Sequence, residues 1–254
     1  IRGGDKVLYA DLAAAEDNAA ANVDYLDFND NGIDVGYHSS WKGKNESGKE
    51  YVAWCWKAGN ETTIVTNDTT NCSDVTQSVN VDAGFAITSY KSSTSASVVF
   101  PHNLGKTPEW IIVKNRNDTN SWMVWHKGLT AGNNNLRLDT AAAMASSGSG
   151  YINAPTSTLI NLEAGGGNVA GSGTNYICYA WTGIEGYSKF GKYEGNNSAD
   201  GTFVYLGFKP AWVLIKNIDY GTFWTLFDNK RSPINLCQNT LTPDNANVEQ
   251  TSGG

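Results

Sequence analysis

The chain has 254 residues, 17% of them charged and 11% aromatic, and its formal net charge is −7. The negative charge argues against nucleic acid as a partner, and no apolar run approaches the roughly 20 residues that a membrane-spanning helix needs. The chain is rich in Gly, Asn, Ser and Thr and contains only 2 Met, a composition typical of many short strands and turns.

Residues 1–58 are predicted to be the second half of a β module. The alanine-rich stretch Ala13–Ala21 predicts one or two helical turns, with Asp11 as the N-cap. Two strand-like runs then flank Asn31-Gly32, a pair that strongly favours a two-residue hairpin turn. The run Tyr51–Trp56 predicts a strand that closes this module.

The same hairpin also fits the start of a calcium-binding loop. Asp27, Asn29 and Asn31 have the spacing of the first three ligands, and a glycine follows them. The twelfth position of such a loop is His38 instead of Glu, and the flanking runs predict strands instead of helices. We therefore interpret the stretch as a hairpin turn and keep the calcium site as the alternative.

The rest of the chain divides into three parts. Residues 59–83, rich in Thr, Asn, Asp and Ser, are predicted to be a connector. Residues 84–181 predict a complete β-sandwich module, and residues 182–254 predict the first part of a further one. The expected fold is therefore all-β, with tandem antiparallel β-sandwich modules of which the terminal ones are incomplete.

The central feature is a sequence motif that predicts a strand and occurs twice, as Lys106–Asn115 and as Lys209–Asn217. Both copies continue through a short loop into a second strand with a tryptophan, which predicts a hairpin. The matched pairs, all 102 positions apart (210 − 108 = 102), are Pro108 and Pro210, Trp110 and Trp212, Lys114 and Lys216, Asn115 and Asn217, and Trp122 and Trp224. We therefore expect the two hairpins to overlay strand for strand.

Two further matches extend the repeat. The run Tyr51–Trp56 resembles Tyr176–Trp181, and the two ends of the chain match each other, with Leu12 opposite Leu241. The pattern predicts a segment of a longer repeat array, because such units recur along a chain. The side chains expected to be largely buried are Trp110, Ile112, Trp122, Val124, Trp212, Leu214 and Trp224.

Candidate chemistry is sparse. No phosphate loop, nucleophile elbow or dinucleotide fingerprint is present, and the scattered carboxylates suggest no pair for glycan hydrolysis. The four cysteines show no disulfide or zinc spacing. His126 is matched by Asp228 in the second copy, which favours a structural role. We expect no catalytic residue, no cofactor and no metal, and therefore no enzyme.

Aromatic side chains in loops are the best candidates for contact with sugars. Most of the 9 Trp and 12 Tyr fall in predicted core strands, where packing is their expected role. Trp41, Tyr151 and Tyr220 lie in predicted loops, and we expect them to be exposed and able to contact glycan.

Several short sequence motifs of the chain resemble those of a known family, the tail-fibre-like and other virion structural proteins of marine bacteriophages. The phrases that carry the resemblance are Gly32–Gly36, Tyr51–Gly59, His102–Pro108, Ile111–Asn115, Tyr176–Trp181, Glu185–Tyr193 and Asp200–Tyr205. They cover most of the chain in the family's order. The resemblance assigns no catalytic residue.

The resemblance implies a virion structural protein of fibre or spike type that binds the host surface without catalysis. The alternatives are a capsid decoration or cementing protein and, from another class, a glycan depolymerase. The expected partners are further copies of the chain, with a trimer as the first expectation, other virion proteins and host surface glycan. Neither nucleic acid nor membrane insertion is expected. The implied location is the virion, after folding in the host cytoplasm.

Overall fold

The computed structural model describes residues 6–18, 26–36, 45–59, 62–64, 69–130, 132–145 and 150–251. Within these ranges the chain forms strands and no helix, which confirms the all-β prediction. It follows that no described helix could cross a membrane. The strands are β1 Lys6–Val7, β2 Asp17–Asn18, β3 Asp27–Asn29, β4 Gly32–Asp34, β5 Thr62–Ile64, β6 Cys72–Asn80, β7 Phe85–Ser92, β8 Val98–Pro101, β9 Trp110–Asn115, β10 Met123–His126, β11 Leu136–Arg137, β12 Leu159–Leu162, β13 Asn175–Trp181, β14 Trp212–Ile215 and β15 Thr225–Asp228.

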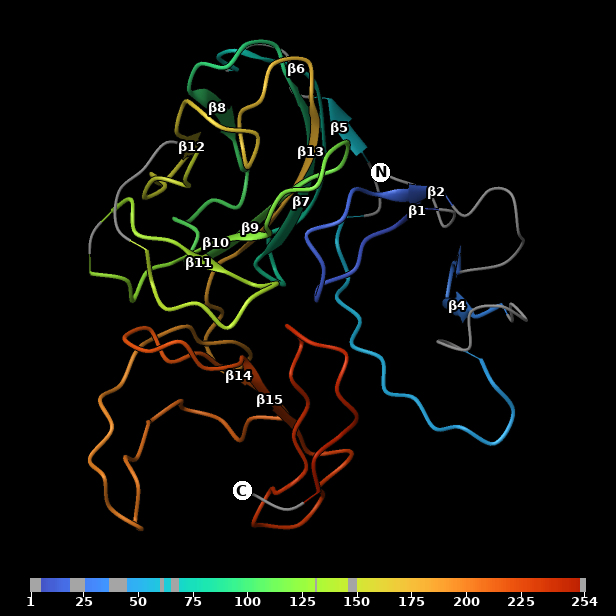
Figure 1. Ribbon diagram of the computed structural model, residues 1–254, viewed down its shortest axis with the longest axis vertical. Coiled ribbons are helices and arrows are strands. Elements are labelled where there is room, and N and C mark those ends of the chain that lie inside the picture. Colours follow the sequence, from blue (N-terminus) through green and yellow to red (C-terminus); the bar gives the residue numbers. More distant parts are fainter. Residues whose placement is uncertain are drawn as a thin grey trace.

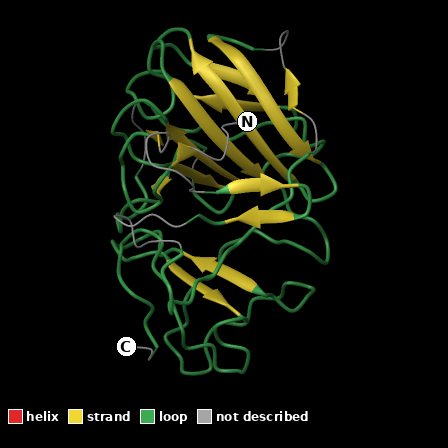
Figure 2. Cartoon of the chain, turned by 90° about the vertical axis from the view of Figure 1, so that its right-hand side faces the viewer, coloured by secondary structure: helices red, strands yellow, loops and turns green. Residues whose placement is uncertain are grey.

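Seven strands form the central sheet, which fills the upper part of the molecule in Figures 1 and 2. The order is β11-β10-β9-β13-β7-β6-β5, and all neighbours are antiparallel. The late strand β13 lies between β7 and β9, with Tyr179 opposite Ile87 on one side and Ile112 on the other. The central position of the sheet is therefore occupied by β13, the strand that comes last in the sequence among the seven.

The prediction of a connector over residues 59–83 is wrong for its second half. Strand β6 pairs along most of β7, and β5 pairs with β6 at the edge of the sheet. Polar side chains of β6 are buried but satisfied, since Gln77 Nε2 donates to Thr88 Oγ1 at 3.0 Å. The polar composition of this segment suggested a loop. Hydrogen bonds inside the fold nevertheless allow these polar residues to be buried in a strand.

Apolar side chains cover both faces of the central sheet. One face carries the first core cluster, to which β8 and β12 contribute Phe100 and Ile160. The other face carries the second core cluster, which includes Trp110 and Trp181. Along β9 the side chains alternate between the two clusters, with Trp110 on one side and Ile111 on the other. This two-sided burial explains why the β9 sequence is apolar from Trp110 to Val113.

The hairpin β14–β15 lies below the central sheet in Figure 1 and repeats the hairpin β9–β10. In the first hairpin Trp110 is opposite His126, and in the second Trp212 is opposite Asp228. The remaining pairs of the two hairpins correspond in the same way. The repeat inferred from the sequence therefore holds at the level of strand register.

Burial agrees with the prediction in the first hairpin and only partly in the second. Trp110, Ile112, Trp122, Val124 and Trp224 are buried, as expected. Trp212 and Leu214 are half-buried, because β14 pairs with β15 on one edge, whereas β9 has a strand on both edges. Both side chains still pack against the second core cluster.

The segment before the central sheet differs from its prediction. Residues 51–56 form no strand and are exposed, although their sequence resembles β13. The described part of the predicted helix, up to Asn18, is a loop that ends in the short strand β2. The hairpin is present as β3–β4, with Asp30 and Asn31 in its turn, one position earlier than the sequence suggested.

Candidate functional site: the joint between repeats

Three loops of the same construction recur along the chain, and we call them loop A (residues 7–17), loop B (residues 135–145) and loop C (residues 240–250). Each is closed by an antiparallel pair between its first and last residue. The pairs are Val7 with Asp17, Asn135 with Ala145, and Thr240 with Gln250. Each loop also carries Leu at its second position and Asp at its fifth.

Loops B and C continue directly from a repeated hairpin. Leu136 of loop B pairs with Val124 of β10, and Leu241 of loop C pairs with Leu226 of β15. The Asp of each loop accepts a hydrogen bond from the backbone of the buried tryptophan in that hairpin. The distances are 2.9 Å from Trp122 N to Asp139 Oδ1 and 3.2 Å from Trp224 N to Asp244 Oδ1. Each loop thus belongs to the repeat that precedes it.

This arrangement corrects the alignment of the two ends of the chain. The sequence had placed Leu12 opposite Leu241, whereas the loops place Leu8 opposite Leu241. Identical residue types had suggested the first alignment. The second rests on the paired ends of the loops, which the sequence does not display.

Loop A packs on the hairpin β9–β10 through hydrogen bonds that involve its backbone, and three of them have counterparts at the second hairpin. Trp122 Nε1 donates to Tyr9 O at 2.9 Å, and Lys114 Nζ donates to Ala13 O at 3.1 Å. The backbone N–H of Glu16 donates to Arg116 O at 2.9 Å. The indole and the ammonium of the hairpin therefore satisfy loop carbonyls that would otherwise be buried without partners.

Loop B packs on the hairpin β14–β15 with the same three bonds. Trp224 Nε1 donates to Arg137 O at 2.9 Å, and Lys216 Nζ lies 3.4 Å from Ala141 O. The backbone N–H of Met144 donates to Ile218 O at 2.9 Å. The loop of one repeat thus binds the hairpin of the next, and we call this contact the joint.

The second core cluster fills both joints. Leu8 of loop A and Trp122 of its hairpin belong to it, as do Met144 of loop B and Trp224 of the second hairpin. Trp110 from the central sheet is part of the same cluster. The repeats therefore share one apolar core across their joints instead of being joined by a bare linker.

The two joints differ in several contacts, since only at the first does Trp122 Nε1 lie 3.2 Å from a second carbonyl, Leu12 O, and only there does Asn120 N donate to the loop, at 2.9 Å from Ala13 O. A salt bridge is a further difference. In the first, Arg116 donates from Nε and Nη2 to the two carboxylate oxygens of Glu16, at 3.0 and 2.9 Å, and both side chains are largely buried. In the second, the corresponding residues are Ile218 and Met144, which both pack on the second core cluster. The two joints thus share three hydrogen bonds to the loop backbone. The charged pair of Arg116 and Glu16 at the first joint is replaced by an apolar pair at the second.

Lys114 and Lys216 occupy the same place in their joints. Each Nζ also donates to the carbonyl of the asparagine that follows it, at 2.7 Å from Lys114 and 2.8 Å from Lys216. Burial lowers the pKa of Lys114 from 10.5 to about 8, although the carboxylates of Asp139 and Asp118 act in the opposite direction. Burial lowers the pKa of Lys216 as well.

The lowered pKa predicts a specific dependence of stability on pH. The unfolded chain keeps the proton of Lys114 up to about pH 10.5, whereas the folded chain releases it near pH 8. Unfolding between these values takes up a proton, so the contribution of Lys114 to the free energy of unfolding rises with pH in this window and is constant below it. Urea denaturation from pH 6 to 10 should show this rise in the difference between the native chain and Lys114→Met. A difference that stays constant over the whole range would contradict the assignment.

The second strand of each hairpin ends in the same kind of turn, which a side chain at its last residue stabilises. His126 Nδ1 accepts a hydrogen bond from Gly128 N at 3.0 Å, and Asp228 Oδ1 accepts one from Lys230 N at the same distance. Burial, with a contribution from the Lys127 charge, lowers the pKa of His126 to about 4, so its ring is neutral at pH 7 and can accept. The exchange of His for Asp between the copies thus preserves a turn.

The aromatic residues predicted to contact glycan have different environments. Trp41 lies outside the described residues. Tyr151 packs partly against the first core cluster, whereas Tyr220 is 71% exposed. The residues of the calcium alternative, Asp27, Asn29 and Asn31, lie on the exposed β3–β4 hairpin, where Asn29 Nδ2 donates to Asp34 Oδ2 at 2.9 Å. Among the described residues, no three His, Cys, Asp or Glu side chains are grouped to hold a metal ion.

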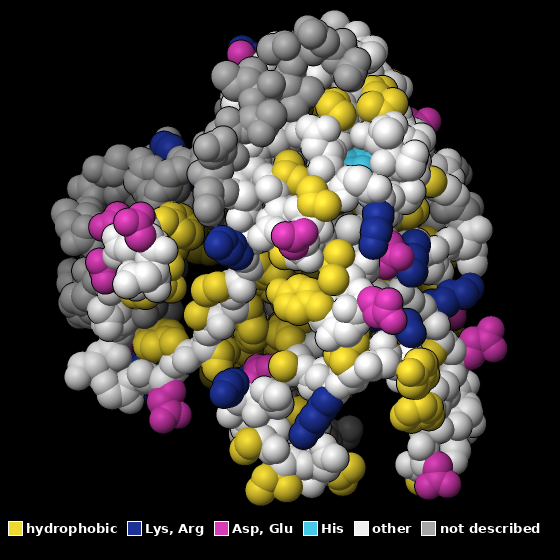
Figure 3. All heavy atoms as spheres, turned by 180° about the vertical axis from the view of Figure 1, so that it is seen from behind, with side chains coloured by type: hydrophobic (Ala, Val, Ile, Leu, Met, Phe, Trp, Pro, Cys, Tyr) yellow, Lys and Arg dark blue, Asp and Glu magenta, His cyan; other side chains and the backbone are white. Residues whose placement is uncertain are grey.

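Tyr220 belongs to a larger group of exposed aromatic side chains, whose other members the sequence interpretation did not single out. Its members are Tyr187, Tyr193, Phe203, Tyr205, Tyr220 and Phe223. One of them, Tyr187, matches the buried Phe85 of the central sheet but is 59% exposed. Apolar side chains also gather in a recess on the face shown in Figure 3.

Comparisons with known proteins add a family. No curated protein and no solved structure matches the chain significantly. One family model matches residues 1–254, under the description "Domain of unknown function (DUF7483)". The chain, with its two matched hairpins and three matched loops, therefore belongs to the DUF7483 family.

Proposed function

We propose that the chain is a repeat-built structural protein of a bacteriophage virion, of fibre or spike type, whose modules are tandem β-sandwiches. The observation that carries the proposal is the joint. At both joints the loop of one repeat binds the hairpin of the next through three matching hydrogen bonds, so these repeats follow one another in the same direction along the chain. Proteins built in this way form extended bodies, because each repeat contacts only its neighbours. The resemblance of the sequence phrases to virion proteins supports the same role.

The proposal includes contact with host surface glycan without catalysis. Exposed rings such as Tyr205 and Tyr220 offer flat apolar faces with a polar edge, which suits stacking on sugars. The scattered carboxylates support a binding role instead of the alternative depolymerase. Copies of the chain and other virion proteins are the further proposed partners, with trimers as the first expectation, since exposed strand edges favour self-association.

Electron microscopy of the phage particles, labelled with a gold-coupled antibody against this chain, tests the location. Label along fibres or spikes is the expected result, whereas label spread evenly over the capsid would favour the alternative decoration protein. Particles without label at either place would contradict a virion role.

A binding assay with host capsular polysaccharide and lipopolysaccharide tests the glycan contact. Binding should fall in a Tyr205→Ala/Tyr220→Ala variant and persist in a Tyr151→Phe control, whose side chain is half-buried. The same incubation should release no reducing ends. Release that a single Asp or Glu substitution abolishes would establish the depolymerase instead.

A further inference from the structure

We infer that the tenth residue of a loop, Glu16 in loop A and Met144 in loop B, determines which hairpin that loop binds. A glutamate at this position selects a hairpin with an arginine, and a methionine selects a hairpin with an apolar residue. The inference deepens the proposed role as a repeat-built protein and rests on it, since it explains how repeats joined by similar contacts keep a fixed order.

The contacts that the two joints share do not distinguish one loop from the other. Trp122 Nε1 donates to Tyr9 O at 2.9 Å. Trp224 Nε1 donates to Arg137 O at the same distance. The acceptors are backbone carbonyls, which every residue of a chain supplies. These bonds would form with either loop at either hairpin, so selection requires a contact between side chains.

The tenth residue lies opposite the same hairpin position at both joints. Glu16 N donates to Arg116 O, and Met144 N donates to Ile218 O, each at 2.9 Å. At the first joint the two side chains form a largely buried ion pair, with Arg116 Nη2 2.9 Å from Glu16 Oε1. At the second joint both side chains pack on the second core cluster. The place of the pair is therefore the same, and its chemistry differs.

The opposite assignment of loops to hairpins would leave charges without partners. With loop A on the second hairpin, the carboxylate of Glu16 would face Ile218. With loop B on the first hairpin, the guanidinium of Arg116 would face Met144. A buried charge that loses its partner is strongly destabilising, because it stays removed from water without compensation. Both wrong pairings are therefore penalised, as a specific contact requires.

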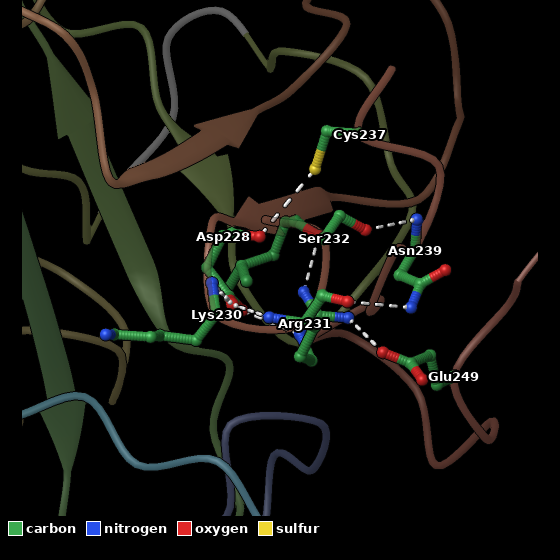
Figure 4. Close-up of polar contacts among 8 residues, drawn as sticks. Asp228, Lys230, Arg231, Ser232, Cys237, Asn239 and Glu249 are labelled. Atoms are coloured by element: carbon green, nitrogen blue, oxygen red, sulfur yellow. Dashed lines mark hydrogen bonds and ion pairs between the residues drawn. The ribbon is translucent and has the colours of Figure 1, made fainter. Parts of the chain in front are cut away.

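The residue that the loop meets in its own repeat follows the same rule. In loop C the tenth residue is Glu249, whose Oε1 accepts a hydrogen bond from Arg231 Nη1 at 2.7 Å (Figure 4). Arg231 follows β15 and also donates from Nε to Asp228 Oδ2 at 2.6 Å. Leu129 stands at the matching place after β10 and packs, like Met144, on the second core cluster. A glutamate at the tenth position is thus bound by arginine in both described cases, whereas the methionine lies in an apolar cluster.

Variants with the same amino-acid composition as the native chain test the inference. The loop variant, Glu16→Met/Met144→Glu, mismatches both joints, and the hairpin variant, Arg116→Ile/Ile218→Arg, mismatches them as well. In urea denaturation each should lower the folding equilibrium constant roughly a hundredfold or more. The fourfold variant combines both changes and restores a match at each joint, so it should recover at least about tenfold of that loss.

Hydrogen exchange shows whether the loops have left the hairpins. The amides of residues 16 and 144 donate across the joints, so they should lose protection in the loop and hairpin variants and regain it in the fourfold variant. Full protection in the loop variant, or a fourfold variant no more stable than the other two, would overturn the inference. If the loop variant does not fold, the fourfold variant decides: cooperative unfolding with both amides protected supports the inference, and failure to fold overturns it.

Conversion of a single joint provides the matched control. Glu16→Met/Arg116→Ile gives the first joint the apolar pair of the second, and its folding equilibrium constant should stay within about tenfold of the native value. Glu16→Met alone leaves Arg116 unpaired and should lie roughly a hundredfold below the double variant. Equal stability of these two variants would overturn the inference. That result with label present on fibres would remove this inference alone, whereas the expected results without any virion label would remove the proposed function alone.

Discussion

Replacing Trp122 by alanine is expected to lower the free energy of unfolding by about 3–5 kcal/mol, as measured by urea denaturation. The indole is 6% exposed and belongs to the second core cluster, so its removal leaves a cavity at the first joint. Its Nε1–H also satisfies the carbonyl of Tyr9 at 2.9 Å. The loss therefore combines a packing defect with an unpaired polar group.

Two variants separate these contributions. Trp122→Phe keeps most of the apolar volume and removes the hydrogen bond to loop A, so it should cost about 1–3 kcal/mol. Trp224→Ala makes the same change at the second joint, where the indole is 4% exposed and donates to Arg137 O.

Hydrogen exchange identifies the mechanism. In Trp122→Ala the amide of Glu16, which donates to Arg116 O, should lose protection, because loop A is released from the hairpin. Trp224→Ala should leave that amide protected in the folded state and expose the amide of Met144 instead. Equal protection of Glu16 in all variants would show that the indole does not hold the loop.

The sequence alone was sufficient to predict the hairpins. Trp110 and Trp212 stand at matched places in two apolar runs, and the same spacing to the second tryptophan sets the strand register. A short apolar run that is rich in β-branched residues and bounded by turn signals favours a strand over a helix. Duplication of such a pattern leaves little freedom in the pairing.

Other strands could not be predicted, because whether such a segment forms a strand depends on the strands that lie beside it. Strand β6 is polar in sequence, and it is stable in the sheet because Gln77 and its neighbours find hydrogen bonds there. The run Tyr51–Trp56 has nearly the sequence of β13 but forms no strand, since no strands equivalent to β7 and β9 flank it among the described residues. Propensity for a strand is realised only on a suitable neighbouring surface.

The joint could be recognised only in part. The lysine and the tryptophan that bind the loops were visible as repeated residues, but their acceptors are backbone carbonyls of Tyr9 and Ala13, which any residue supplies. The matched pairs of Glu16 with Arg116 and of Met144 with Ile218 become visible only once the loops are placed on the hairpins. Spatial pairing, not residue type, carried that information.

Replacing Trp110 by alanine is expected to cost about 3–5 kcal/mol and to weaken both hairpins at once. The indole is 9% exposed and stacks on Trp181 with ring centroids 4.4 Å apart, in the core cluster that also holds Trp224 of the second hairpin. Because the core is shared, we expect the central sheet and the β14–β15 hairpin to unfold in a single cooperative transition, so that a cavity in that core destabilises both.

Phe100→Ala is the matched control, because Phe100 is fully buried in the first cluster on the other face of the sheet. Its removal should cost a similar free energy but leave the local opening of β14–β15 unchanged, whereas Trp110→Ala should speed exchange of the Leu226 amide, which donates to Leu241 O, even under native conditions. Two separate thermal transitions in the native chain, or equal exchange at Leu226 in both variants, would mean that the repeats are independent units. The apolar contacts of Trp212 and Leu214 with the second cluster argue for the single transition, because these half-buried side chains would lose that cover if the central sheet unfolded.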